Sequence, residues 1–287
     1  MMLADAIRAE TWRLLQNRTV LLWSIVFVPI AGLAASIAGN LFIDDKMSAL
    51  GERLPSQLRL ERGTLDLGQA LLEAAGTLAN PAVLAFLLIG AATVFATDYR
   101  WETWRLITAR NSRPNLIMGK AGAMKLMVLA GLALMLGSAF IAALAKGLIF
   151  DNRFVFHFSA EAARSFGLLL LLAYVRVVQF LLLALLAATV TRSLVAALFI
   201  PLVVGVAQAF LAKASLFAGW RMGDWPTMLL FPGEAYEALK ALIQGGMTAA
   251  VLPSGAAWRA VAGLALWSFA PFFLALWWFQ RQDLSKE

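Results

Sequence analysis

The chain has 287 residues, of which 61% are hydrophobic and 14% charged, and its formal net charge at pH 7 is +7. Soluble globular domains are typically about half apolar and about a quarter charged, so this composition argues against a water-soluble fold. The sequence has no cysteine and one histidine, His157, which excludes a disulfide, a thiolate metal site and a cysteine nucleophile. We therefore expect no metal and no cofactor bound by this chain itself.

Six apolar segments are long enough to cross a bilayer, because about 20 residues of helix span a hydrocarbon core of roughly 30 Å. They are residues 19–40, 80–96, 121–149, 165–190, 193–212 and 257–279. The third segment is longer than one crossing requires, which indicates a tilt or an extension into the cytoplasm. The sequence thus predicts an all-α membrane protein with six transmembrane helices, forming a single transmembrane domain over residues 1–287.

The charges that flank these segments predict the orientation of the chain. With the N-terminus in the cytoplasm, the inside segments carry twelve basic and six acidic residues, whereas the outside segments carry eleven of each. Cytoplasmic loops of membrane proteins are enriched in lysine and arginine, so we expect both termini and the connection after the second span to be cytoplasmic. The basic net charge therefore indicates membrane topology and not nucleic-acid binding.

The N-terminal residues 1–18 have the pattern of an amphipathic helix. Leu3, Ile7 and Leu14 fall near one helical face, although Glu10 interrupts this apolar stripe. We interpret the segment as an interfacial elbow helix that lies along the inner leaflet before the first span. The alternative is an ordinary basic flank that only sets the orientation of the first span.

The outside segment 213–256 is too apolar for a plain loop. It is interrupted by several prolines and glycines, so it cannot cross the membrane as one helix. This pattern predicts short extracytoplasmic helices before the last span. The sequence is compatible with helices that dip back into the outer leaflet and with helices that rest as a cap on the bundle.

The cytoplasmic segment 97–118 has the composition of a protein docking surface. It reads TDYRWETWRLITARNSRPNLIM, and Pro114 ends or redirects the short helix that its first part predicts. Tryptophan and arginine are the residue types most often found as binding hot spots. Both are also common at the lipid headgroups, so composition leaves a docking role and a purely interfacial role open.

This segment resembles the first cytoplasmic loop of ABC-2 type permeases, the membrane subunits of ATP-binding-cassette exporters. The residues that follow the order of the family motif are Asp98, Thr103, Arg105, Leu106, Ser112, Arg113, Gly119 and Lys120. Glu102 stands where the family usually has glycine, Trp104 stands where it usually has leucine, and a proline follows Arg113 instead of preceding the arginine. The order of an amphipathic helix, six spans and an apolar outer segment before the last span also resembles this family.

The resemblance implies a permease subunit of the bacterial inner membrane that pairs with a second copy or a homologue. Separate cytoplasmic ATPase subunits would bind ATP and Mg and drive it through a coupling helix, whose expected contact residues are Asp98, Trp101, Glu102, Thr103, Trp104 and Arg105. The chain itself lacks a Walker A pattern, because Gly119 and Lys120 are followed by alanine. The alternatives are an assembly or anchor subunit without transport activity and a membrane enzyme that acts on a lipid-linked substrate.

Arg176 lies near the middle of the fourth predicted span. A cation at that depth costs between about 2.5 and more than 10 kcal/mol unless it is paired or hydrated. Gln179 lies one turn along the same face, and Gln208 in the fifth span is a candidate neighbour. We take these three residues as candidates for a translocation path, and a structural hydrogen-bond anchor is the alternative.

Overall fold

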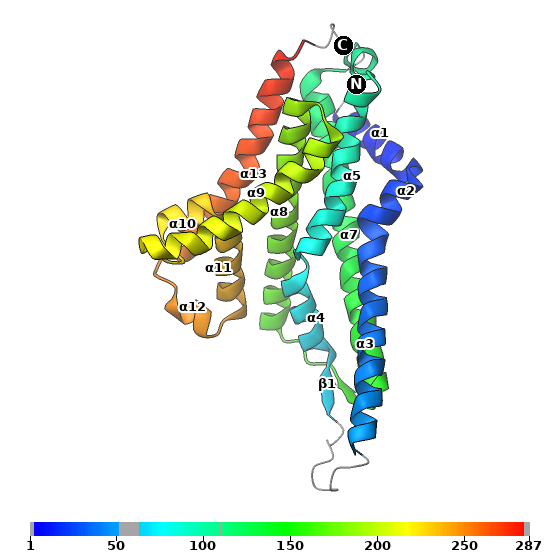
Figure 1. The fold of residues 1–287 in the computed structure, drawn as a ribbon, viewed down its shortest axis with the longest axis vertical. Coiled ribbons are helices and arrows are strands. Elements are labelled where there is room, and N and C mark those ends of the chain that lie inside the picture. Colours follow the sequence, from blue (N-terminus) through cyan, green and yellow to red (C-terminus); the bar gives the residue numbers. More distant parts are fainter. Residues whose placement is uncertain (1–2, 52–62, 110, 284–287) are drawn as a thin grey trace.

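The structure, a computed structural model, describes residues 3–51, 63–109 and 111–283, and most of this part of the chain is helical. Six helical segments in it are long and apolar enough to cross a membrane: Arg18–Met47, Pro81–Arg100, Arg113–Ile149, Ala160–Thr191, Leu194–Ala218 and Ala256–Arg281. The prediction of a multi-pass helical membrane protein is therefore confirmed (Figure 1).

The described residues form a series of helices and two short strands. In chain order they are α1 (Leu3–Gln16), α2 (Arg18–Leu21), the π-helical turn η1 (Leu22–Val26), α3 (Phe27–Gly51), β1 (Thr64–Asp66), α4 (Leu67–Thr77), α5 (Pro81–Arg100), α6 (Trp104–Thr108), α7 (Arg113–Ile149), β2 (Arg153–Val155), α8 (Ala160–Thr191), α9 (Leu194–Ser215), the 3-10 turn η3 (Leu216–Ala218), α10 (Trp225–Leu230), α11 (Pro232–Gln244), α12 (Met247–Val251) and α13 (Ala256–Arg281). Three of the long helices begin at a polar side chain that accepts a hydrogen bond from the first turn, namely Asn80, Ser159 and Ser193.

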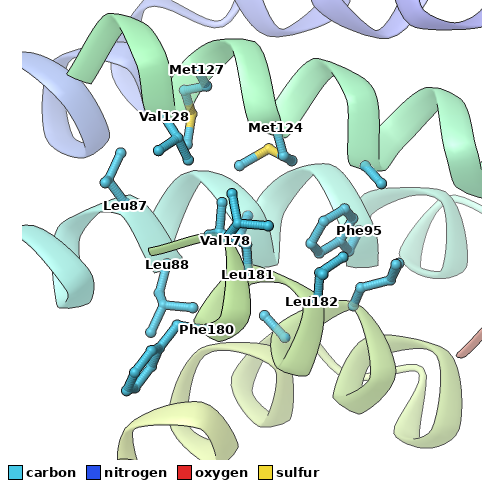
Figure 2. Close-up of a cluster of buried hydrophobic side chains, with 14 of the residues drawn as sticks. Leu87, Leu88, Phe95, Met124, Met127, Val128, Val178, Phe180, Leu181 and Leu182 are labelled. Atoms are coloured by element: carbon cyan, nitrogen blue, oxygen red, sulfur yellow. The ribbon is translucent and has the colours of Figure 1, made fainter. Parts of the chain in front are cut away.

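The hydrophobic core lies where α5, α7 and α8 meet. Figure 2 shows this cluster, with Leu87 and Phe95 on α5, Met124, Met127 and Val128 on α7, and Leu181 on α8. The most apolar windows of α5 and α8 are each 61% buried, whereas that of α9 is only 11% buried. The outer helices therefore expose apolar side chains that a water-soluble protein would cover, as expected for helices that face lipid or another subunit.

Two short strands depart from the all-helical expectation. β1 pairs in parallel with β2, with Leu65 opposite Phe154. The Asp66 carboxylate accepts hydrogen bonds from the backbone N–H groups of Gly68 and His157, at 2.9 and 3.1 Å. The hydrogen bond from the His157 backbone lowers the pKa of Asp66, because it stabilises the ionised carboxylate. Asp66 thus joins the start of α4 to the end of β2, which explains why this ladder forms between two connecting segments.

The segment before the last span contains the short helices α10, α11 and α12. Figure 1 shows them beside α8 and α13, on the side away from α3. Met228 of α10 and Ala235 of α11 pack against Leu172 of α8 and Leu264 of α13 in a second buried cluster. The indole N–H of Trp267 in α13 donates to the backbone oxygen of Leu229 in α10, at 2.8 Å. α10 and α11 therefore pack on α8 and α13, whereas α12 has no buried residue.

Candidate functional site

Four charged side chains, three of them buried, form a cluster where α1, α5 and α7 meet, at the end of the bundle that carries both α1 and the last turn of α13. We call Glu10, Arg13, Asp98 and Lys120 the charge cluster. The carboxylate of Asp98 is fully buried and lies 2.5 Å from the ammonium of Lys120 and 2.9 Å from the guanidinium of Arg13. The hydroxyl of Thr103 also donates to Asp98, at 2.5 Å. The carboxylate of Asp98 in α5 therefore holds α1 and α7 against α5.

Lys120 completes the cluster. Its ammonium donates to the backbone oxygen of Val94 at 2.7 Å, lies 3.5 Å from the carboxylate of Glu10, and sits 5.3 Å from the centre of the Trp104 ring. Glu10 is 8% exposed, so it lies on the buried face of α1. The acidic residue that interrupts the apolar stripe of α1 is thus the partner of a buried lysine. With two cations and two carboxylates the cluster is electrically balanced, which buried charges require.

Trp104 joins α6 to the end of α13. Its side chain is 1% exposed, and its ring centre lies 4.6 Å from that of Phe279 and 5.3 Å from that of Tyr99. The hydroxyl of Tyr99 donates to the side-chain oxygen of Gln282, just beyond α13, at 3.0 Å. The loop between α5 and α7 is therefore held on one side by the charge cluster and on the other side by α13.

Arg113 forms a second connection between this loop and α13. Its guanidinium donates to three backbone oxygens at the end of α13, those of Phe279, Gln280 and Gln282, at 3.3, 2.9 and 2.7 Å. The last carbonyls of a helix lack most of their intrahelical donors. Among the described residues, only the carbonyl of Phe279 of these three accepts a backbone hydrogen bond, from the N–H of Gln282 at 3.4 Å, so Arg113 supplies donors at this end. We expect Arg113→Ala to speed amide hydrogen exchange in the last turn of α13 by roughly tenfold, since hydrogen bonds from a charged donor are worth about 1.5–3 kcal/mol.

Hydrogen exchange with mass spectrometry on the purified chain measures this effect. Arg18→Ala, a change of an exposed arginine in α2, is the matched control and should leave the last turn of α13 unchanged. Equal protection of this turn in Arg113→Ala and in the unsubstituted chain would contradict the assigned role.

The six expected coupling residues fall into two groups. Asp98 and Trp104 are buried and Thr103 is half-buried, whereas Trp101 is 65% exposed and Glu102 is also exposed. The backbone of Arg105 lies in α6, but its side chain lies outside the described part of the structure.

Leu106 is a further exposed residue of this loop, at 73%, and it was not among the expected contact residues. The guanidinium of Arg100 lies 5.4 Å from the Trp101 ring. Among the described side chains, the surface that a partner can touch includes Arg100, Trp101, Glu102 and Leu106, which we call the exposed loop surface. The sequence could not show which side of α6 faces outward, because a helix of five residues is too short to display a periodic pattern.

The structure brings Arg176, Gln179 and Gln208 close to one another. The guanidinium of Arg176 donates to the side-chain oxygen of Gln179 at 3.2 Å and lies 4.8 Å from the Phe180 ring. Gln179 in turn donates to the backbone oxygen of Leu264 in α13 at 2.7 Å. Arg176 and Gln208 line a cavity of about 420 Å³ between α5, α8, α9 and α11.

A larger cavity of about 1000 Å³ lies on the other side of α8, between α8, α11 and α13. Its walls are mostly apolar, and the charged residues that line it are Lys125, Glu161 and Arg164. Among the described residues, no group of three or more histidine, aspartate or glutamate side chains is placed to hold a metal ion.

Comparison with protein-family models, with curated proteins and with solved structures found no match. The fold and the site define the chain as a multi-pass helical membrane protein with a tryptophan-bearing loop fixed to both α1 and α13.

Proposed function

We propose that this chain is the permease subunit of an ATP-driven exporter of the ABC type. In this proposal both termini and the α5–α7 loop face the bacterial cytoplasm, and the helices form the translocation path in a dimer. Separate subunits bind ATP and Mg and dock on the exposed loop surface. This chain supplies no catalytic residue to ATP hydrolysis.

The observation that carries the proposal is the position of the exposed loop surface on a firmly held loop. Trp101 and Leu106 present apolar side chains outward, and interfaces of this kind commonly centre on such anchors. The same loop is joined to α1 through Asp98 and to α13 through Trp104. A force applied to this surface therefore acts on two helices and not on a free hairpin.

The contacts of α13 extend this connection into the bundle. Phe279 at one end of α13 touches Trp104, and the backbone oxygen of Leu264, four turns earlier, accepts from Gln179. Gln179 is the direct partner of Arg176. A shift of α13 that follows the loop would therefore alter the surroundings of the Arg176 cavity, which is the physical link that the proposal requires between ATP hydrolysis and the path.

The double substitution Trp101→Ala with Leu106→Ala tests the docking role. We expect it to lower vanadate-sensitive ATP hydrolysis by the co-purified complex about tenfold or to release the ATPase subunit, because two exposed anchors of an interface would be lost. The chain should still insert and fold, since neither side chain is part of the core. ATP hydrolysis and subunit content are measured on the complex in mild detergent.

The matched control is Trp12→Ala with Leu15→Ala, which removes an exposed tryptophan and leucine from α1, at the same end of the bundle. Hydrolysis should remain near the level of the unsubstituted complex in this control. A complex that contains no nucleotide-hydrolysing subunit would refute the exporter proposal and favour an anchor subunit or a membrane enzyme. Equal hydrolysis in both double variants would refute the docking surface.

A further inference from the structure

The cavity beside Arg176 carries opposite charges that do not pair with each other. Arg176 on α8 and Glu234 on α11 both line it, yet they form no salt bridge. In the described part of the chain, Arg176 donates to the amide of Gln179, lies over the ring of Phe180 and is near enough to Glu237 to feel its charge, but it forms no salt bridge. Glu234 has no hydrogen-bond or salt-bridge partner there. Two charges without a salt bridge in a partly buried site are costly, so a ligand that pairs with both is favoured.

The guanidinium of Arg176 also lies at the start of α11. A Cβ atom placed on Gly233 would be 3.5 Å from its Nη2 atom. The N-terminus of a helix carries a partial positive charge, and no side chain caps α11. A cation beside that terminus is unfavourable, and Glu234, the acidic residue in the first turn of α11, forms no salt bridge with it. The Arg176 wall of the cavity therefore suits a phosphate or carboxylate.

The α11 wall of the cavity carries the opposite charge. Glu234 and Glu237 both line it, and Glu237 lies 3.8 Å from Lys240, which neutralises part of its charge. Burial, together with the nearby Glu237, raises the pKa of Glu234, and a bound ammonium group would relieve this cost. A purely anionic ligand would be repelled by the carboxylates of Glu234 and Glu237, and a purely cationic ligand would be repelled by Arg176.

The remaining walls of the cavity are apolar. They are formed mainly by Pro81, Leu84, Leu202, Val206, Ala209 and Phe231. Val206 is 56% exposed, so the rim on α9 reaches the outer surface of the bundle, where lipid lies in the proposed orientation. A volume of about 420 Å³ accommodates a small headgroup, with hydrocarbon chains leaving across α9.

We propose that this cavity binds the headgroup of a zwitterionic amphiphile, with its anionic group at Arg176 and its ammonium group at Glu234. The claim that this cavity is the substrate site of the exporter rests on the proposed function. Binding itself is a property of this chain alone. It is therefore measured without the ATPase subunit, so that failure of one proposal is distinguished from failure of the other.

The test is equilibrium binding of short-chain lipids to the purified full chain in detergent, followed by native mass spectrometry. The probes are a phosphatidylethanolamine with both charges, a phosphatidylglycerol with the anion alone, an alkylamine with the cation alone, and free phosphoethanolamine without chains. We expect phosphatidylethanolamine to bind about tenfold more tightly than each of the other three, because only it satisfies both charges and the apolar rim.

Two substitutions assign the two ends of the headgroup. Arg176→Gln should weaken phosphatidylethanolamine and phosphatidylglycerol about tenfold, whereas Glu234→Gln should weaken phosphatidylethanolamine and leave or improve phosphatidylglycerol. Arg164→Gln, which removes a cation from the larger cavity, is the matched control and should change neither affinity. The thermal midpoint of each variant shows whether it is folded.

Equal affinities for the four probes, or equal losses in Arg164→Gln and Arg176→Gln, would overturn the inference. Tight binding of free phosphoethanolamine would show that the ligand is a soluble zwitterion and not an amphiphile, which would also overturn the inference. If phosphatidylethanolamine binds as expected while no ATPase subunit is found, the site stands and the exporter proposal fails.

Discussion

Asp98→Ala is expected to lower the free energy of unfolding by about 3–5 kcal/mol, the typical cost of removing one partner from a buried ion pair. The substitution leaves the ammonium of Lys120, which is 1% exposed, with the carboxylate of Glu10 at 3.5 Å as its nearest anionic partner. It also removes the carboxylate that holds Arg13, and so loosens α1 from the bundle. The loss is measured as a lower thermal midpoint of the purified chain in detergent.

A second variant separates the charge from the packing. Asp98→Asn with Lys120→Met removes both charges of the pair and keeps similar volumes, so it should recover a large part of the lost stability, because buried ion pairs can often be replaced by apolar groups of similar size. Lys125→Met, on the same helix but at an exposed position, is the control for the lysine change and should stay within about 0.5 kcal/mol of the unsubstituted chain. Asp98→Ala with an unchanged thermal midpoint would contradict the charge cluster.

Gly263→Ala is expected to separate α10 from α13 and to lower the free energy of unfolding by about 1–3 kcal/mol, the usual cost of overpacking. A Cβ atom on Gly263 would lie 2.0 Å from the backbone oxygen of Met228 and 2.9 Å from its carbonyl carbon. Both are backbone atoms, so no side-chain rotation relieves the clash. The helices must move apart, and the hydrogen bond from Trp267 to α10 at 2.8 Å would be strained as well.

Gly167→Ala on α8 is the matched control, because no atom lies within 4 Å of a Cβ placed there. Alanine favours a helix over glycine by about 1 kcal/mol, so this variant should be neutral or slightly stabilised. Thermal midpoints of both variants decide the comparison. Equal midpoints for Gly263→Ala and Gly167→Ala would show that the close approach of α10 and α13 is not required.

The Gly263 prediction also bears on the Arg176 cavity. α10 leads directly into α11, whose residue Glu234 forms one wall of the cavity, and α11 packs against α13. Displacing α10 should therefore move Glu234 relative to Arg176. If the cavity binds a zwitterionic headgroup, we expect Gly263→Ala to weaken phosphatidylethanolamine more than phosphatidylglycerol, as measured in the same binding assay.

Several features of the candidate site were predictable only in part. Arg176, Gln179 and Gln208 were expected as neighbours because they are polar residues in apolar spans, and the structure places all three around one small cavity between α8 and α9. Glu234, the opposite charge of the cavity, was not expected, because it belongs to a segment outside the predicted spans. Its polarity alone is ordinary for an extracytoplasmic helix, so the sequence carried no signal for it.

The sequence by itself determined the class of the protein and its long helices. Apolar runs of about 20 residues or more predict helices because a chain in a bilayer must satisfy its backbone hydrogen bonds within each segment. That requirement is local, so no knowledge of the partners is needed.

Only the tertiary structure decided which polar residues in and beside the α5–α7 loop face inward. Asp98 meets Arg13, which is 85 positions away along the chain, and Lys120 meets Glu10, which is 110 positions away. Burial of a charge depends on the partner that reaches it, and pairs at such separations leave no periodic pattern in one sequence. For the same reason Trp104 is buried against Phe279 while Trp101, three residues earlier, remains exposed.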